Sequence, residues 1–359
     1  MGLSVMTAGP KVLISAMKDE GPYILEWVAH HKVIGFDEII VYTNDCSDGT
    51  NKILKRLEQL GYIKFHNNRV GTGGVHRSAL RQARRLQEVK DAAWIYVTDA
   101  DEFLNIHVGN GKLDDLIAAT GADVDVIPIP WRIFSNNGRH VLRNSRVCTQ
   151  FTDAEPTYED GGAGRRFVKS LFRNTGDFYR FGLHNPHERE EVKGKHVWAL
   201  PGGHQKTNLA FGNHVPPPFG HEIAQINHYA VRSTQAYLNK RYRGRANHMS
   251  HLLGSEYWER WNRGGVKDDT IGRYDEEVSA QLNTFMSDAD LSREHRAAFR
   301  FHKRRLQELL ALPEYTSLYS KLAKLQPINC PRIDRKIRPT ISDRANDDTV
   351  PNKGAEKDE

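Results

Sequence analysis

The sequence predicts an α/β fold in which a mostly parallel sheet is flanked by helices. Short runs of β-branched apolar residues alternate with segments of helical periodicity over about the first 130 residues. The 359 residues indicate about two domains, or one large α/β domain with an appendage, at roughly 150 residues per domain. Since strands that alternate with helices in this way form βαβ units, the strands should run parallel, with helices on both faces.

The first half of the chain supplies the alternating elements. A strand at 12–16 precedes a helix that Pro22 opens and that ends near Gly35, a residue suited to a left-handed cap. A strand at 38–43 precedes a helix that Thr50 is expected to cap. Further elements follow in this order: a strand at 62–66, a basic amphipathic helix at 75–89, a strand at 94–98, a helix at 113–119 and a strand at 124–129.

The second half of the chain is less regular. Strands are expected at 167–172 and 178–181, and the Pro- and Gly-rich segment 192–222 is expected to loop over the sheet edge. Helical periodicity returns at 232–243, 278–286 and 294–312. We therefore expect a flexible N-terminus at 1–10, an α/β domain at 11–245, a helical extension at 246–328 and a disordered tail at 329–359.

The positive charge is concentrated near the C-terminus. Residues 293–338 hold 12 Lys and Arg against 4 Asp and Glu, whereas the whole chain has a net charge of +6. This segment could contact nucleic acid, dock on an anionic membrane surface or a polysaccharide assembly complex, or be a solvated helix face, and the last interpretation is favoured. The net positive charge of the chain therefore says little about the chemistry of the residues outside this segment.

Cysteine content and hydropathy indicate a cytoplasmic location. Cys46, Cys148 and Cys330 are far apart, which excludes a disulfide framework and a CxxC zinc pair. No apolar stretch reaches the roughly 18 residues that a membrane helix needs, and the N-terminus lacks a signal-peptide pattern. We expect a cytoplasmic protein, with peripheral association at the inner face of the membrane as a further option.

A pair of carboxylates follows the strand at 94–98. Asp99 and Asp101 have i, i+2 spacing, so an extended backbone would direct both side chains to one side. Mn²⁺ or Mg²⁺ prefers oxygen ligands and often combines one or two carboxylates with substrate phosphates. The alternative is an ordinary acidic loop, because the same pattern recurs at Asp123 and Asp125. The position at a strand end favours the cation site.

Several linked blocks resemble one enzyme family. Lys18-Asp19-Glu20-Gly21-Pro22-Tyr23, the segment 42–50 and Asp99-Ala100-Asp101-Glu102-Phe103 resemble the GT-A glycosyltransferases of the family 2 and family 92 type. Later blocks at 131–138, 169–172, 184–187 and 227–229 continue the resemblance in the same order. It covers roughly residues 11–245 and implies a GT-A-like, Rossmann-like domain that uses a nucleotide-sugar donor.

The resemblance also implies roles for particular residues. Asp99 and Asp101 would form the metal-binding DxD element, and Asp99 would also contact the donor. His228 matches a late metal-binding histidine, with His184 as the alternative. The donor-binding candidates are Glu20, Asn44, Asp45 and Arg77. Glu20 could instead be a carboxylate favoured by the helix dipole, and Arg77 could simply be solvated.

The implied reaction is transfer of a sugar, with inversion, from a UDP-sugar to a saccharide acceptor in surface or exported polysaccharide synthesis. A carboxylate must then take the acceptor proton. The candidate bases are Asp153, Glu155, Glu159 and Asp160. An inactive glycan- or nucleotide-binding protein of the same fold is the alternative. A dinucleotide oxidoreductase and a P-loop NTPase are excluded, since neither glycine motif is present, and nucleic acid is not an expected partner.

Overall fold

The structure is a computed structural model. It describes residues 9–157, 166–200, 202–203, 206–208, 210, 212–215, 220–244 and 253–329. The predicted N-terminal segment 1–10 and tail 329–359 therefore lie almost wholly outside the described residues.

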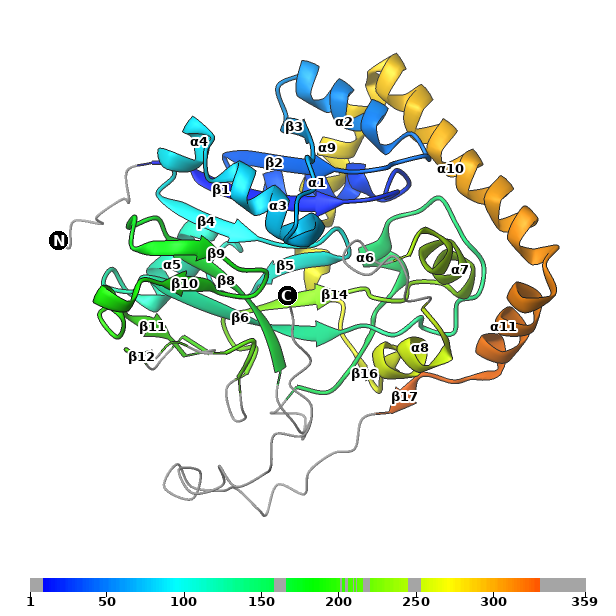
Figure 1. Cartoon of the computed structure of the whole chain (residues 1–359). Helices are drawn as coiled ribbons and strands as arrows, with labels where there is room; N and C mark the ends of the chain where they lie inside the picture. Colours follow the sequence, from blue (N-terminus) through cyan, green and yellow to red (C-terminus); the bar gives the residue numbers. More distant parts are fainter. Residues whose placement is uncertain are drawn as a thin grey trace, which may run out of the picture.

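A mixed sheet forms the centre of the molecule (Figure 1). Its parallel half consists of β1 (Lys11–Met17), β2 (Glu38–Thr43), β3 (Lys64–Asn67) and β4 (Trp94–Val97). β8 (Arg166–Arg173) runs antiparallel between β4 and β6 (Val126–Ile133). With β11 (Trp198–Ala199) and β12 (Lys206–Thr207) at one edge, the order is β12-β11-β6-β8-β4-β1-β2-β3. The expected α/β fold with a mostly parallel sheet is therefore confirmed.

The two faces of the sheet have separate apolar cores. In β1, Val12 and Ile14 face one core while Leu13 faces the other, as the period of two in a strand requires. The core at Leu13 includes side chains of α1 (Ile24–Val33) and α2 (Thr50–Gln59). The core at Val12 is covered by α3 (Gly74–Ala83). Helices thus cover both faces, as predicted from the alternation.

The remaining elements complete both halves of the chain. In the first half they are α4 (Gln87–Lys90), β5 (Glu102–Ile106), α5 (Leu113–Thr120), α6 (Val147–Gln150) and β7 (Asp153–Ala154). Small strands follow: β9 (Phe178–Phe181), β10 (Pro186–Glu188), β11 (Trp198–Ala199), β12 (Lys206–Thr207), β13 (His214–Val215) and β14 (Ala224–His228). The C-terminal elements are α7 (Thr234–Arg243), α8 (Ser255–Trp261), β15 (Arg263–Gly264), β16 (Val266–Lys267), α9 (Asp275–Ser287), α10 (Ala289–Leu310), α11 (Pro313–Lys324) and β17 (Ile328–Asn329), with 3₁₀ turns at Glu190–Val192 and Thr270–Tyr274.

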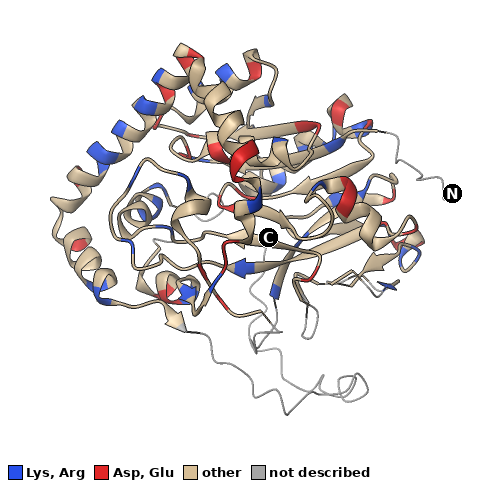
Figure 2. Cartoon of the chain, turned by 180° about the vertical axis from the view of Figure 1, so that it is seen from behind, with Lys and Arg blue, Asp and Glu red and all other residues tan. Residues whose placement is uncertain are grey.

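The C-terminal helices pack against the α/β core. α9 lies along α1, and α10 crosses α2 and continues to α7. Figure 1 shows α10 as a long helix along one margin of the molecule, with α11 turning back at its end. Lys and Arg recur along the length of α10 (Figure 2). The predicted helical extension is therefore built onto the same sheet that carries the strand ends.

Several predicted boundaries were wrong for local reasons. The helix predicted at 75–89 is broken after Ala83, because the chain turns before the short α4. The residue before α2 is Gly49, with a φ of 95°, and Thr50 is the first helical residue rather than the cap. β5 was not predicted, although its five residues are buried and pair with β14. No helix in the described part of the chain has the length and apolarity that crossing a membrane requires.

Candidate active site at the carboxyl ends of the strands

Acidic residues gather where the parallel strands end. β1, β2 and β4 run in one direction, so the loops after them meet at one edge of the sheet. Asp99 and Asp101 lie between β4 and β5, with residues 100 and 101 in a turn. The extended backbone predicted for this pair is therefore wrong, because the chain reverses here to enter β5. The two carboxylates consequently meet different partners.

Asp99 is paired with a lysine from β8. Lys169 Nζ donates to Asp99 Oδ2 at 2.9 Å and lies 3.6 Å from Glu102 Oε2. On the other side, His76 Nδ1 lies 3.9 Å from Asp99 Oδ1. Burial would raise the pKa of Asp99, but Lys169 and His76 outweigh it and hold the pKa at about 2. Asp99 is therefore ionised, and the charge of the buried Lys169 serves to stabilise it.

Asp101 is paired with a lysine from α7. Lys240 Nζ donates to Asp101 Oδ2 at 2.7 Å, while His228 Nε2 lies 3.8 Å from Asp101 Oδ1. Burial acts against ionisation, but Lys240 and His228 hold the pKa of Asp101 well below its ordinary value. A backbone bond from Tyr229 N to Asp101 O, at 2.8 Å, joins the end of β14 to this turn. His228 is thus brought to the predicted carboxylate by strand pairing.

Asp101 and His228 have the chemistry and spacing for one small cation. Two ligands of an ion with bonds of about 2.1 Å lie at most about 4.2 Å apart, so the 3.8 Å separation is compatible with a shared ion. His228 Nδ1 is buried without a hydrogen-bond partner. No group of three or more His, Cys, Asp or Glu suited to a metal occurs among the described residues. A cation here would therefore need further ligands from a substrate.

His184, the alternative ligand, has different surroundings. His184 Nδ1 is 2.7 Å from Val168 O, and its ring packs against Trp131 and Phe167. Burial and the nearby Lys169 lower the pKa of His184 to about 3. The ring of His228 lies 4.3 Å from Trp131, between centroids. Both histidines thus border the same tryptophan, but the pairing with Asp101 involves His228.

Glu20 is held by two arginines that the sequence analysis did not single out. Arg232 Nη1 donates to one carboxylate oxygen at 2.9 Å and Arg243 Nη2 to the other at 2.5 Å. Arg232 also donates to Ala100 O at 3.1 Å and stacks 3.7 Å from the centroid of Tyr23. Both carboxylate oxygens of Glu20 are thus engaged within the protein. A role for Glu20 in donor binding stays a prediction, and its observed role is to orient the arginines.

The other predicted donor-binding residues line the same edge. Asn44 follows β2 and is buried, and its Oδ1 has no hydrogen-bond partner. Asp45 is exposed, with a φ of 51°, and accepts from Asn44 Nδ2 at 3.3 Å. Arg77 is exposed near the start of α3. Asn44 is the residue whose unmet hydrogen bond favours a ligand contact, whereas the exposed Arg77 has the surroundings of a solvated side chain.

Two of the candidate bases, Asp153 and Glu155, lie in the described part of the chain, and the carboxylate of each already binds other protein groups. Asp153 accepts from Ser135 Oγ at 2.5 Å and from Gly265 N at 2.9 Å. Glu155 is buried and pairs with Arg166 Nη1 at 2.7 Å. Glu159 and Asp160 lie outside the described residues. The structure does not bring Asp153 or Glu155 into contact with Asp99 or Asp101.

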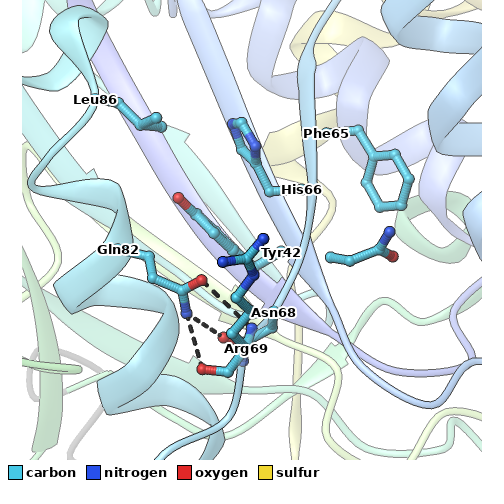
Figure 3. A pocket seen from close by; sticks show the side chains of 8 residues that line it. Tyr42, Phe65, His66, Asn68, Arg69, Gln82 and Leu86 are labelled. Atoms are coloured by element: carbon cyan, nitrogen blue, oxygen red, sulfur yellow. Dashed lines mark hydrogen bonds between the residues drawn. The ribbon is translucent and has the colours of Figure 1, made fainter.

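A cavity lies beside the edge strand β3 (Figure 3). It has a volume of about 470 Å³ and is lined by Tyr42, Phe65, His66, Asn67, Asn68, Arg69, Gln82 and Leu86. Gln82 Nε2 donates to Asn68 Oδ1 at 2.8 Å and to Arg69 O at 3.1 Å, which closes one wall. None of the residues that line the cavity belongs to the turn of Asp99 and Asp101, so the paired carboxylates are not part of it.

The basic helix α10 contributes to the same edge, which corrects the view of a purely solvated face. His302 Nε2 donates to Asp48 Oδ2 at 2.8 Å, and Arg305 Nη1 donates to Asp19 Oδ2 at 3.1 Å. Both basic side chains are buried, whereas their neighbours Lys303 and Arg304 are exposed. The loops after β1 and β2 are therefore held by the C-terminal helix.

A family comparison covers this part of the chain. Residues 17–135 match the family model of glycosyltransferase family 92. The matched segment is about a third of the chain and runs from the end of β1, through the Asp99 and Asp101 turn, to just beyond β6. The match confirms the resemblance to glycosyltransferase family 92 over this segment.

Solved structures show weaker similarity to this chain. Residues 1–349 of S. aureus TarS in complex with UDP-GlcNAc are 14% identical, with 88% of each chain covered and a TM-score of 0.33. A structure of S. aureus TarS is 21% identical over 37% of this chain and 23% of that chain, with a TM-score of 0.27. The mannosyltransferase Ktr4p of S. cerevisiae is 6% identical over 37% of this chain and 42% of that chain, with a TM-score of 0.23.

The scores of these structural similarities are too low to support a functional argument. This chain spans only about a quarter of the TarS chain to which it is 21% identical. No curated protein sequence matches the chain.

Proposed function

We propose that this protein is a glycosyltransferase that moves a sugar from a nucleotide-sugar donor, a UDP-sugar, to a saccharide acceptor. The observation that supports this most directly is the ion-paired turn of Asp99 and Asp101 at the carboxyl end of β4, inside the segment that matches family 92. Ligands of open α/β sheets bind at this edge. The preference for uridine rests on the family resemblance.

The proposed cofactor is Mn²⁺ or Mg²⁺. Asp101 and His228 are the proposed ligands, because the 3.8 Å between Asp101 Oδ1 and His228 Nε2 fits two ligands of one ion. When bound, such an ion stabilises the negative charge that develops on the departing diphosphate. Asp99 would orient the donor through its ribose, since a carboxylate accepts hydrogen bonds from hydroxyl groups. Asn44 Oδ1, which has no partner, would accept a hydrogen bond from the base or the ribose.

The proposed reaction is an inverting displacement. The acceptor hydroxyl oxygen forms a bond to the anomeric carbon as the bond from that carbon to the diphosphate oxygen breaks, and a carboxylate base takes the hydroxyl proton. The base is one of Asp153, Glu155, Glu159 and Asp160. Because the carboxylates of Asp153 and Glu155 are engaged by Ser135 and by Arg166, Glu159 and Asp160 are the preferred candidates.

The proposed setting is surface or exported polysaccharide synthesis on the cytoplasmic side, with peripheral membrane association as an option. The exposed Lys303 and Arg304 of α10 would favour an anionic surface.

A panel of nucleotide sugars tests the donor proposal. Thermal shift with UDP-, GDP-, dTDP- and ADP-sugars, each with Mn²⁺, should show stabilisation by a uridine donor, because a ligand that binds only the folded state raises the melting temperature. A labelled sugar from that donor should then appear on a saccharide acceptor or on water. Binding without any turnover would support the inactive binding protein instead, and no stabilisation by any donor would contradict both.

A further inference from the structure

Lys240 has a hydrogen-bonding capacity that its protein contacts do not use fully. An ammonium has three N–H donors. Two of them make short bonds, to Asp101 Oδ2 and to Ala230 O, each at 2.7 Å. The third points to Tyr257 Oη at 3.4 Å, which is long for a hydrogen bond. One donor of Lys240 is therefore available for a stronger acceptor.

Solvent reaches Lys240 but hardly reaches Lys169, the lysine that pairs with Asp99. The side chain of Lys240 is 18% exposed, whereas that of Lys169 is 1% exposed. Both ammonium groups pair with one carboxylate of the same turn. A donor molecule arriving at this edge would consequently meet Lys240, while Lys169 would stay behind Asp99.

The position of Lys240 is set by a rigid connection from β14. Arg232 has a φ of 54°, which is unusual for a residue with a long side chain, and it is buried with its guanidinium on Glu20 and Ala100. Ser233 then caps α7 by accepting from Ala236 N at 3.2 Å. Strained backbone persists only where the surroundings enforce it. The turn thus aims α7, and with it Lys240, at Asp101.

Acidic and basic side chains are already paired at the Asp99 and Asp101 turn before a donor binds. Among the described residues, the ion pairs at this turn join Glu20, Asp99, Asp101 and Glu102 to Lys169, Arg232, Lys240 and Arg243. A nucleoside diphosphate would add negative charge to this edge, and a charge-assisted hydrogen bond from an ammonium is a strong way to offset it. Lys240 is the most exposed cation of the set, at 18% against 13% for Arg243, and it has a weakly used donor.

We propose that Lys240 binds the diphosphate of the nucleotide donor and gives the site an affinity for nucleoside diphosphates that does not require a divalent cation. The inference rests on the proposed function and deepens it by assigning the leaving-group contact to α7. In the complex, the third N–H of Lys240 would turn from Tyr257 to a phosphate oxygen while the bond to Asp101 is kept.

The test compares UDP with uridine in the presence of EDTA. Calorimetry should detect UDP binding to the wild-type protein in EDTA, and Lys240→Met should weaken it by about 10- to 100-fold, the range expected for one hydrogen bond to a charged group. Uridine, followed by ligand-observed NMR, should bind both proteins equally because it has no phosphate. Lys240→Arg should keep most of the affinity for UDP. Lys52→Met, which removes a charge from a side chain that is 73% exposed on α2, should have no effect.

A second pair of variants guards against misfolding, because Lys240→Met leaves the buried Asp101 unpaired. Asp101→Asn should bind UDP in EDTA at least as well as the wild type, and Asp101→Asn combined with Lys240→Met should bind it about 10- to 100-fold more weakly than Asp101→Asn alone. Equal UDP affinity within either pair, or equal losses for UDP and uridine, would overturn the assignment of Lys240 while leaving the proposed function standing. If the wild type binds no nucleoside diphosphate with or without Mn²⁺, both proposals are wrong.

Discussion

His302 and Asp48 join the C-terminal helix to the loop after β2. His302 Nε2 donates to Asp48 Oδ2 at 2.8 Å across a sequence separation of 254 residues, and both side chains are buried. Gly21 N donates to the same oxygen at 2.9 Å, so the loop after β1 is tied to this contact as well. This edge of the sheet therefore depends on α10 for its shape.

Replacing His302 by Leu should destabilise the protein. Breaking a buried pair leaves a charged group without its partner, and such losses are of order 3 kcal/mol. Because Asp48 keeps its bonds from Thr50 and Gly21, we expect a decrease of about 2 kcal/mol in the free energy of unfolding, measured by urea denaturation. Lys303→Ala, next to it but exposed, is the control and should change stability little. Equal stabilities of His302→Leu and wild type would show that α10 does not secure this edge.

Asp101→Asn should abolish the increase in UDP affinity that Mn²⁺ produces. The substitution keeps the shape of the side chain but removes the charge that a cation needs. Calorimetry with and without Mn²⁺ measures the difference directly. Asp123→Asn is a matched control, since Asp123 belongs to the second D-x-D pattern and its side chain is 65% exposed beside Lys206. A normal response to Mn²⁺ in Asp101→Asn would remove Asp101 from the cation site.

The two histidine candidates can be separated by the same measurement. His228→Gln should reduce the effect of Mn²⁺ on UDP binding by at least about tenfold, because even the loss of an outer-shell partner of a metal ligand typically costs about 10- to 100-fold in metal affinity. His184→Gln should retain the effect, because the His184 ring bonds to Val168 O and is not paired with Asp101. The opposite pattern would move the cation site to His184.

Glu159→Gln and Asp160→Asn test the identity of the base. The variant that lacks the base should lose transfer by about 10²- to 10⁴-fold, the usual contribution of general base catalysis, and keep the UDP affinity of the wild type. Transfer is measured with a labelled donor and UDP affinity by calorimetry. Normal transfer rates in both variants would return the search to Asp153 and Glu155.

His30 should make the protein less stable in mild acid. Burial lowers the pKa of His30 to about 4, from an unfolded value near 6.5. As the pH falls from about 6.5 to 4 the unfolded chain binds a proton that the folded chain does not, so the stability contributed by neutral His30 is progressively lost, by roughly 2 to 3 kcal/mol. His30→Gln should show a shallower decline of the unfolding free energy over this range, with no such difference in slope above pH 7. Parallel curves for the two proteins would contradict the assignment.

The predictions from sequence succeeded where the pattern is local. The alternation of apolar runs and helices predicted β1, β2, β4 and the helices between them, because periodicity depends on residues a few positions apart. Asp99 and Asp101 were found from their spacing after β4. The reversal of the chain between them was not predicted. It depends on the pairing of β5 with β14, which lies far along the sequence and leaves no signal in the local pattern.

The sequence by itself determined the α/β class, the order of its first strands and the acidic residues that follow them. Only the tertiary structure decided which basic side chain meets which carboxylate: Lys169 with Asp99, Lys240 with Asp101, Arg232 and Arg243 with Glu20, and His302 with Asp48. These partners lie between 70 and 254 residues apart. Their pairing depends on how whole elements pack, and buried charges must find partners within that packing, so no short-range pattern encodes the choice.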